Sequence, residues 1–309
     1  MKSAYIFFNP KSGKDEQALA KEVKSYLIEH DFQDDYVRII TPSSVEEAVA
    51  LAKKASEDHI DLVIPLGGDG TINKICGGVY AGGVYAGGAY PTIGLVPAGT
   101  VNNFSKALNI PQERNLALEN LLNGHVKSVD ICKVNDDYMI SSLTLGLLAD
   151  IAANVTSEMK RKLGPFAFLG DAYRILKRNR SYSITLAYDN NVRSLRTRLL
   201  LITMTNSIAG MPAFSPEATI DDGLFRVYTM EHIHFFKLLL HLRQFRKGDF
   251  SQAKEIKHFH TNNLTISTFK RKKSAIPKVR IDGDPGDQLP VKVEVIPKAL
   301  KFIIPNSLP

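Results

Sequence analysis

The first third of the chain alternates between short apolar runs and segments in which apolar positions recur with helical spacing. The strand-like runs are residues 4–8, 36–40, 62–66 and 92–96. Residues 16–29 and 45–56 have the spacing of amphipathic helices. Strands that alternate with helices favour parallel pairing through crossover connections. We therefore predict a three-layer α/β domain over residues 1–128.

From about residue 130 the pattern changes to short β-branched segments separated by turn residues. These segments are residues 183–188, 198–204, 225–230 and 263–268. The pattern favours antiparallel strands, and two helices are expected between them, at residues 166–177 and 234–246. We predict a mostly antiparallel β-sandwich domain over residues 129–295, and we allow for a return of residues 296–309 to the first domain.

An internal repeat, GGVYA-GGVYA-GGAY, occupies residues 77–90. Pairs of glycines weaken helices and strands alike. We therefore expect the helix that begins near residue 72 to end near residue 76. The repeat is then an extension of a surface loop, with a functional lid as the less favoured alternative.

The composition is that of a globular protein, because 44% of the residues are hydrophobic and 23% are charged, with both signs present. The two cysteines, Cys76 and Cys132, have neither a CxxC partner nor a histidine at metal-ligand spacing. No run approaches the roughly 20 apolar residues that span a bilayer, and the first residues lack a signal-peptide pattern. We expect a cytoplasmic protein.

The net charge of +7 predicts an anionic partner, which could be a phosphate-bearing ligand, nucleic acid or an acidic lipid surface. Basic residues gather in segments 160–180 and 270–273, and others follow the apolar residues of segment 234–242. Basic and apolar groups together suit an anionic bilayer, although a solvated charged face is an equal alternative. No RNP, helix-turn-helix or zinc pattern supports nucleic acid.

The sequence Gly67-Gly68-Asp69-Gly70-Thr71 follows a predicted strand and precedes a predicted helix. Glycines at such a junction let backbone N–H groups surround an anion, and the helix N-terminus contributes favourable partial charge. The pattern predicts a phosphate site. A carboxylate at Asp69 would act through Mg²⁺ or a positioned hydroxyl group, although a tight turn with Asp69 as a helix cap remains an alternative.

Two further glycine-bearing turns follow predicted strands. They are NPKSGK at residues 9–14 and PAGTVNN at residues 97–103. The carboxyl ends of parallel strands meet at one edge of a sheet, where ligands bind. We therefore expect the three turns to converge.

Together, NPKSGK, GGDGT and GTVNNF resemble the diacylglycerol kinase catalytic domain family, in its small bacterial lipid kinase branch. The resemblance extends through nearly the whole chain. KLGPFA at residues 162–167, PEATIDDGL at residues 216–224, and DGD with the later LP at residues 282–290 are similar to further motifs of that branch. GGDGT alone is shared with NAD kinases and phosphofructokinases.

The resemblance implies ATP and Mg²⁺ as cofactors and assigns roles to individual residues. The implied nucleotide-binding residues are Asn9, Ser12, Gly13, Thr41, Gly67, Gly68, Asp69, Gly70, Thr71, Thr100 and Asn102. Asp222, with the backbone carbonyls of Thr219 and Leu224, is implied to bind a structural Mg²⁺, although a plain hairpin turn explains this segment equally well. The implied catalytic residues are Asp284, as the general base, and Asp69, near the γ-phosphate.

Three positions depart from the family pattern. Asp284 stands where the family has glutamate, Asn103 where it has aspartate, and Lys74 where it has glutamate. Each change removes or shortens an acidic group at the implied site. Phosphoryl transfer depends on metal placement and charge balance, so we predict weak kinase activity.

The leading hypothesis is an ATP- and Mg²⁺-dependent kinase that phosphorylates the hydroxyl of a membrane lipid such as diacylglycerol. Its expected partners are the lipid alcohol and the inner face of an anionic membrane, which it binds peripherally, and a homodimer is a possible assembly. The alternatives are a catalytically impaired nucleotide- or lipid-binding homologue and, less favoured, an NAD kinase. Diacylglycerol, phosphatidylglycerol, an isoprenoid alcohol and a sphingoid base all remain open as the acceptor.

Overall fold

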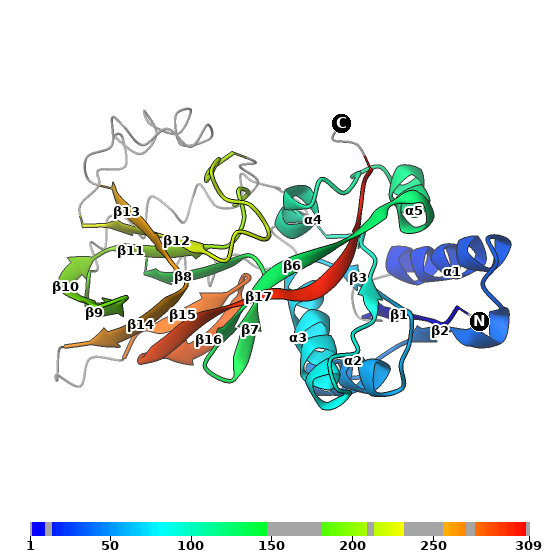
Figure 1. Ribbon diagram of the computed structural model, residues 1–309, viewed down its shortest axis with the longest axis horizontal. Coiled ribbons are helices and arrows are strands. Elements are labelled where there is room, and N and C mark those ends of the chain that lie inside the picture. The colour runs from blue at the N-terminus through cyan, green and yellow to red at the C-terminus, as the bar shows by residue number, and fades with distance from the viewer. Residues whose placement is uncertain are drawn as a thin grey trace. The chain divides into compact units, whose positions relative to one another are not determined.

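The chain divides into two compact units, of which the first comprises Met1–Ile131 and Pro297–Pro309 and the second Cys132–Ile296. The structure, a computed structural model, describes residues 2–9, 14–99, 101–146, 181–208, 213–231, 256–269 and 276–306 (Figure 1). Two long strands, β6 (His125–Val134) and β17 (Val291–Ile304), contain the points at which the chain passes from one unit to the other. The predicted domain boundaries stay predictions.

Unit 1 is a parallel sheet with helices packed against it. In chain order its elements are β1 (Ala4–Phe8), α1 (Lys14–Glu29), the 3₁₀ turn η2 (Asp34–Tyr36), β2 (Val37–Ile40), α2 (Val45–Glu57), β3 (Leu62–Gly67), α3 (Asp69–Tyr85), β4 (Thr92–Ile93), β5 (Val96–Pro97), α4 (Asn103–Ala107) and α5 (Arg114–Asn123). The sheet order is β17-β4-β3-β1-β2, and each strand runs parallel to its neighbours. The end of β17 thus joins the sheet of unit 1.

The helices of unit 1 cover the sheet because their apolar faces match its buried strands. Leu19, Val23 and Leu27 of α1 and Leu118 of α5 share one buried cluster with Ile6 and Ile64 of the sheet. Figure 1 shows α2 and α3 on the other side of these strands. Unit 1 therefore has the predicted α/β architecture.

The glycine repeat corrects one expectation, because α3 does not end at residue 76 but continues through the repeat to Tyr85. Two of its glycines face α2: a Cβ on Gly78 would lie 2.6 Å from the carbonyl oxygen of Val49, and one on Gly82 would lie 2.1 Å from that of Lys53. Only glycine permits so close an approach of two helices. The prediction of a surface loop was wrong because tertiary packing outweighs the low helix propensity of glycine.

Unit 2 is a sandwich of two antiparallel sheets. Its strands, besides the shared β6 and β17, are β7 (Asp137–Met139), β8 (Ser142–Gly146), β9 (Tyr182–Tyr188), β10 (Asn191–Thr197), β11 (Leu199–Thr203), β12 (Phe225–Met230), β13 (Ile256–Thr261), β14 (Asn263–Thr268), β15 (Lys278–Ile281) and β16 (Asp284–Gln288). One sheet has the order β10-β9-β14-β17 and the other β13-β12-β11-β8-β15-β16. Buried residues of both sheets, among them Leu186, Ile266, Leu145 and Ile202, form one core cluster, as expected for sheets packed face to face.

Candidate functional site

Asn9, the first residue of the predicted NPKSGK turn, and the predicted Gly67–Thr71 turn lie at the same edge of the unit 1 sheet. β1 pairs in parallel with both β2 and β3, with Phe7 opposite Ile40 and Phe8 opposite Leu66. The exposed residues Asn9 and Thr41 therefore follow neighbouring strands at the edge where β3 leads into the Gly67–Thr71 turn. The start of the first predicted turn thus lies where the Gly67–Thr71 turn begins, whereas residues 10–13 of that first turn lie outside the described residues.

The Gly67–Thr71 turn also touches the turn that follows β5, backbone against backbone. A Cβ on Gly99 would lie 2.6 Å from the Cα of Gly68, closer than real Cβ contacts allow. Gly67 has a φ of 154°, and a Cβ there would lie 2.7 Å from Oγ1 of Thr71. Glycine is thus required at Gly99, where the two turns meet, and at Gly67 within the first turn. Backbone groups of two glycine turns in contact suit the binding of phosphate.

Asp69 joins these two turns through its side chain. One carboxylate oxygen, Oδ2, accepts hydrogen bonds from the backbone N–H of Asn103 at 3.0 Å and from the Asn103 side-chain amide at 3.2 Å. The other, Oδ1, accepts from the backbone N–H of Phe104 at 3.1 Å. Asp69, itself the first residue of α3, therefore caps the N-terminus of α4 from a distant part of the chain. A carboxylate has about four acceptor positions, and the described residues occupy three of them.

The Asn102 side chain has a buried oxygen that fits a ligand-binding role. Asn102 precedes α4 with a φ of 55° and is only 8% exposed. Its amide nitrogen donates to Gln112 Oε1 at 3.4 Å, whereas Oδ1 accepts no hydrogen bond from the residues that the structure describes. An unsatisfied buried acceptor costs about 1–3 kcal/mol. Such an atom beside Gly99 fits a nucleotide site, because a bound donor would remove that cost.

Lys106 belongs to the same surroundings, and the sequence reasoning did not single it out. It lies on α4, and its ammonium group donates to the backbone oxygen of Val101 at 2.5 Å. This bond holds a cation beside the turn that contains Gly99 and Asn102. The lysine in GTVNNFSK was visible in the sequence, but only the fold shows that its side chain turns back toward the glycine turn.

In unit 2, Asp284 is presented by a tight hairpin between β15 and β16. The two turn residues, Asp282 and Gly283, have φ values of 48° and 91°, as in the two-residue turns that suit twisted hairpins. The Asp282 carboxylate accepts hydrogen bonds of 2.7 to 2.9 Å from the backbone N–H groups of Ile140, Ser141 and Ser142. Asp282 is thus the anchor of the hairpin, a role that the sequence reasoning missed, and exposed Asp284 begins β16.

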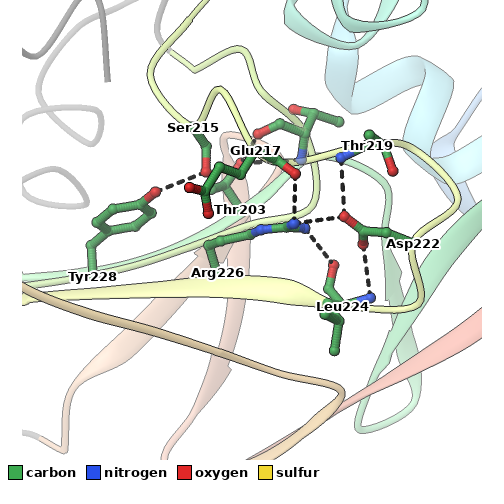
Figure 2. Close-up of polar contacts among 9 residues, drawn as sticks. Thr203, Ser215, Glu217, Thr219, Asp222, Leu224, Arg226 and Tyr228 are labelled. Carbon is green, nitrogen blue, oxygen red and sulfur yellow. Dashed lines mark hydrogen bonds and ion pairs between the residues drawn. The ribbon is translucent and has the colours of Figure 1, made fainter. Parts of the chain in front are cut away.

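The predicted metal turn of unit 2 is held by Asp222 (Figure 2). Its Oδ2 accepts from the backbone N–H of Thr219 at 3.0 Å and its Oδ1 from that of Leu224 at 3.0 Å. Its Oδ2 also lies 2.6 Å from Nη2 of Arg226. Burial alone would raise the pKa of the Asp222 carboxyl, but the Arg226 guanidinium and the two N–H groups lower the pKa overall.

The remaining predicted features cannot be placed. Ser12, Gly13 and Thr100 lie outside the described residues, as do the basic segments 160–180 and 270–273 and the two helices expected at 166–177 and 234–246. The described candidates fall into two sets: Asp69 and Asn102 with the glycine turns in unit 1, and Asp222 and Asp284 in unit 2. Their assigned roles stay predictions.

Comparison with known proteins identifies both parts of the chain. A model of the diacylglycerol kinase catalytic domain matches residues 3–134, and a model described as the YegS C-terminal NAD kinase beta sandwich-like domain matches residues 141–304. The chain belongs to the small bacterial diacylglycerol kinase-like family. Membership of this kinase family implies a nucleotide and usually a divalent metal.

Relatives of this family match the chain over almost its full length. A diacylglycerol kinase of Staphylococcus saprophyticus is 27% identical over 307 residues, which cover 99% of this chain and 97% of that protein. A crystal structure of a diacylglycerol kinase from Bacillus anthracis strain Sterne has a TM-score of 0.73 at 19% identity, covering 100% of this chain and 98% of that one. The structure of yeast NADH kinase matches with a TM-score of 0.51 at 11% identity, and the match covers 99% of this chain and 84% of the yeast chain. At these identities the two structures show the fold alone.

Proposed function

We propose that the protein is an ATP- and Mg²⁺-dependent kinase that phosphorylates the hydroxyl of a membrane lipid such as diacylglycerol. The observation that carries this proposal is the contact of the Gly68 and Gly99 turns at the carboxyl edge of the parallel strands. This surface suits phosphate binding, and it belongs to a chain whose family is named for lipid phosphorylation. Relatives such as the staphylococcal protein carry the same name.

In this proposal each candidate residue has a chemical task. When bound, the nucleotide and its metal supply the phosphoryl group and neutralise its charge. The Gly67–Thr71 backbone and Asn102 bind the nucleotide, and Asp69 fixes the position of α4 beside it. Asp284 accepts the proton of the lipid hydroxyl while that oxygen bonds to phosphorus and the oxygen of ADP leaves.

The hydrogen bond between Asn103 and Asp69 supports the prediction of slow turnover. The Asn103 amide donates to Asp69 Oδ2 at 3.2 Å, where a second carboxylate would need a proton or a cation between the two groups. Asparagine at position 103 pairs with Asp69 without such a proton or cation. It also leaves the site with one acidic metal ligand fewer. Asp284 is also one methylene shorter than glutamate, and a misplacement of about 1 Å can cost around 100-fold in rate.

The proposal is tested by transfer of phosphate from γ-labelled ATP to a panel of lipid alcohols in detergent micelles. We expect slow labelling of at least one lipid that requires Mg²⁺ and is lost in Asp284→Ala. If the protein binds ATP but labels no lipid, the second candidate holds, namely a catalytically impaired homologue, which the Asn103 and Asp284 departures favour. If it neither binds ATP nor labels a lipid, both are refuted.

Membrane association is proposed as peripheral. No helix among the described residues is long and apolar enough to cross a bilayer. The substrate of a lipid kinase lies in a bilayer, and clustered Lys and Arg side chains each contribute about 1 kcal/mol near an anionic surface. We expect the protein to float with vesicles rich in phosphatidylglycerol and not with neutral vesicles. Equal recovery with both kinds would contradict electrostatic binding.

A further inference from the structure

The guanidinium group of Arg226 contacts several oxygen atoms of the turn at residues 217–224, which includes Asp222 (Figure 2). Arg226 is the second residue of β12, and its Nη2 lies 2.6 Å from Asp222 Oδ2 and donates to the backbone oxygen of Glu217 at 2.9 Å. Its Nη1 donates to the backbone oxygen of Leu224 at 3.3 Å. One planar cation thus contacts a carboxylate and two carbonyl groups of the turn.

These oxygen atoms overlap with the donor set that the family resemblance assigns to a structural Mg²⁺. That set consists of Asp222 and the carbonyls of Thr219 and Leu224. In the structure Arg226 contacts both the Asp222 carboxylate and the Leu224 carbonyl, and Thr219 offers Asp222 its N–H group. Mg²⁺ and Ca²⁺ bind oxygen at about 2.0–2.6 Å. An ion that bound both Asp222 Oδ2 and the Leu224 oxygen would need the space that the guanidinium fills.

Charge and burial also disfavour a divalent ion at this turn. The side chains of Arg226 and Asp222 are 13% and 21% exposed, so little water screens the charges. The single positive charge of Arg226 already balances that of Asp222, and a divalent ion would lie against the guanidinium. The turn therefore does not fit the predicted Mg²⁺.

We infer that Arg226 takes the place of the structural divalent cation in unit 2, so that the turn from Glu217 to Leu224 is closed by a side chain of the protein itself. Arginine suits this task because its planar fork of N–H donors contacts several oxygens at once and stays charged at any physiological pH. This inference does not depend on the proposed kinase activity. If the protein requires a divalent metal, that metal binds at a position other than this turn.

The first test measures whether the wild-type turn holds a metal. The thermal unfolding midpoint of the nucleotide-free full chain is measured in EDTA and in millimolar Mg²⁺ or Ca²⁺, for the wild type and for Asp222→Asn. We expect the metals to shift both proteins by the same amount, because any metal that binds does so elsewhere. A metal-induced rise that is larger in the wild type than in Asp222→Asn would overturn the inference.

The second test removes the guanidinium and keeps an apolar side chain. In EDTA, Arg226→Met should unfold roughly 4–8 °C below the wild type, and Mg²⁺ or Ca²⁺ should recover part of the loss by binding the released oxygens. Arg280→Met is the matched control, because the hydrogen bonds that Arg280 makes within the described part of the chain go to the backbone oxygen of Gly283 and to no carboxylate, so metals should not recover its loss. Unchanged stability of Arg226→Met, or no recovery beyond that control, would overturn the inference. Should Arg226→Met not fold, the wild-type comparison still decides it.

Discussion

Removing the Asp69 carboxylate should loosen α4, in addition to any effect on catalysis. Two of its three hydrogen bonds come from backbone N–H groups at the start of that helix, and loss of such a cap costs about 0.5–2 kcal/mol. The third, from the Asn103 amide, adds roughly 0.5–1.5 kcal/mol. We expect Asp69→Ala to lose about 1–3 kcal/mol, and Asp69→Asn, which keeps one acceptor oxygen, about half as much.

The assay for this prediction combines chemical denaturation with amide hydrogen exchange. Exchange at the backbone amides of Asn103 and Phe104 should accelerate strongly in Asp69→Ala, because they lose their acceptor. The control is Asp61→Ala, which removes a carboxylate that precedes β3, at the opposite end of the strand, and accepts hydrogen bonds from Ser3. It should cost less than about 1 kcal/mol and leave the α4 amides unchanged. Equal stability and equal α4 exchange in Asp69→Ala and the wild type would refute the capping role.

Three further predictions concern packing, catalysis and pH. Gly82→Ala should destabilise by about 1–3 kcal/mol in denaturation, because the overlap with the Lys53 carbonyl outweighs the gain of about 1 kcal/mol in helix propensity; a stabilised variant would show that α2 can move away. Asp284→Glu should raise the rate of lipid phosphorylation by roughly 10- to 100-fold if the aspartate side chain is too short to reach the lipid hydroxyl. An unchanged rate would exclude side-chain length as the cause of slow turnover. Since the pKa of Asp222 is lowered on folding, its stabilising effect is complete above its unfolded pKa and is lost as the pH falls below about 4. The stability difference between the wild type and Arg226→Met should shrink at that pH, whereas a constant difference would contradict the ion pair.

Much of unit 1 could be predicted because its signals are local. The strand expected at residues 4–8 is β1 without change, and the helix expected at residues 45–56 differs from α2 by one residue. Ser44 begins α2 as its N-cap, with its hydroxyl accepting from the N–H of Glu47. In such segments the apolar pattern and the cap agree with the tertiary fold.

The features that the sequence did not predict depend on two kinds of contact. Some join residues that are far apart in the chain, and others depend on the direction of a side chain, which the sequence does not determine. The length of α3 depends on α2, which is close enough only because Gly78 and Gly82 lack side chains. Asp69 reaches a helix that begins 34 residues later. Arg226 could equally have pointed into solvent, and no pattern in the sequence shows that it folds back on Asp222. Composition and spacing carry no information on such choices.

One competition experiment separates a lipid kinase from an NAD kinase by giving the protein two acceptors at once. Mg²⁺ and γ-labelled ATP are supplied with diacylglycerol micelles and NAD⁺ in the same reaction, and the label is then separated into lipid and aqueous products. We expect slow labelling of the lipid, no labelling of NAD⁺, and no labelling of either acceptor by Asp284→Ala. Label in NADP⁺, or lipid labelling that persists without the Asp284 carboxylate, would contradict it.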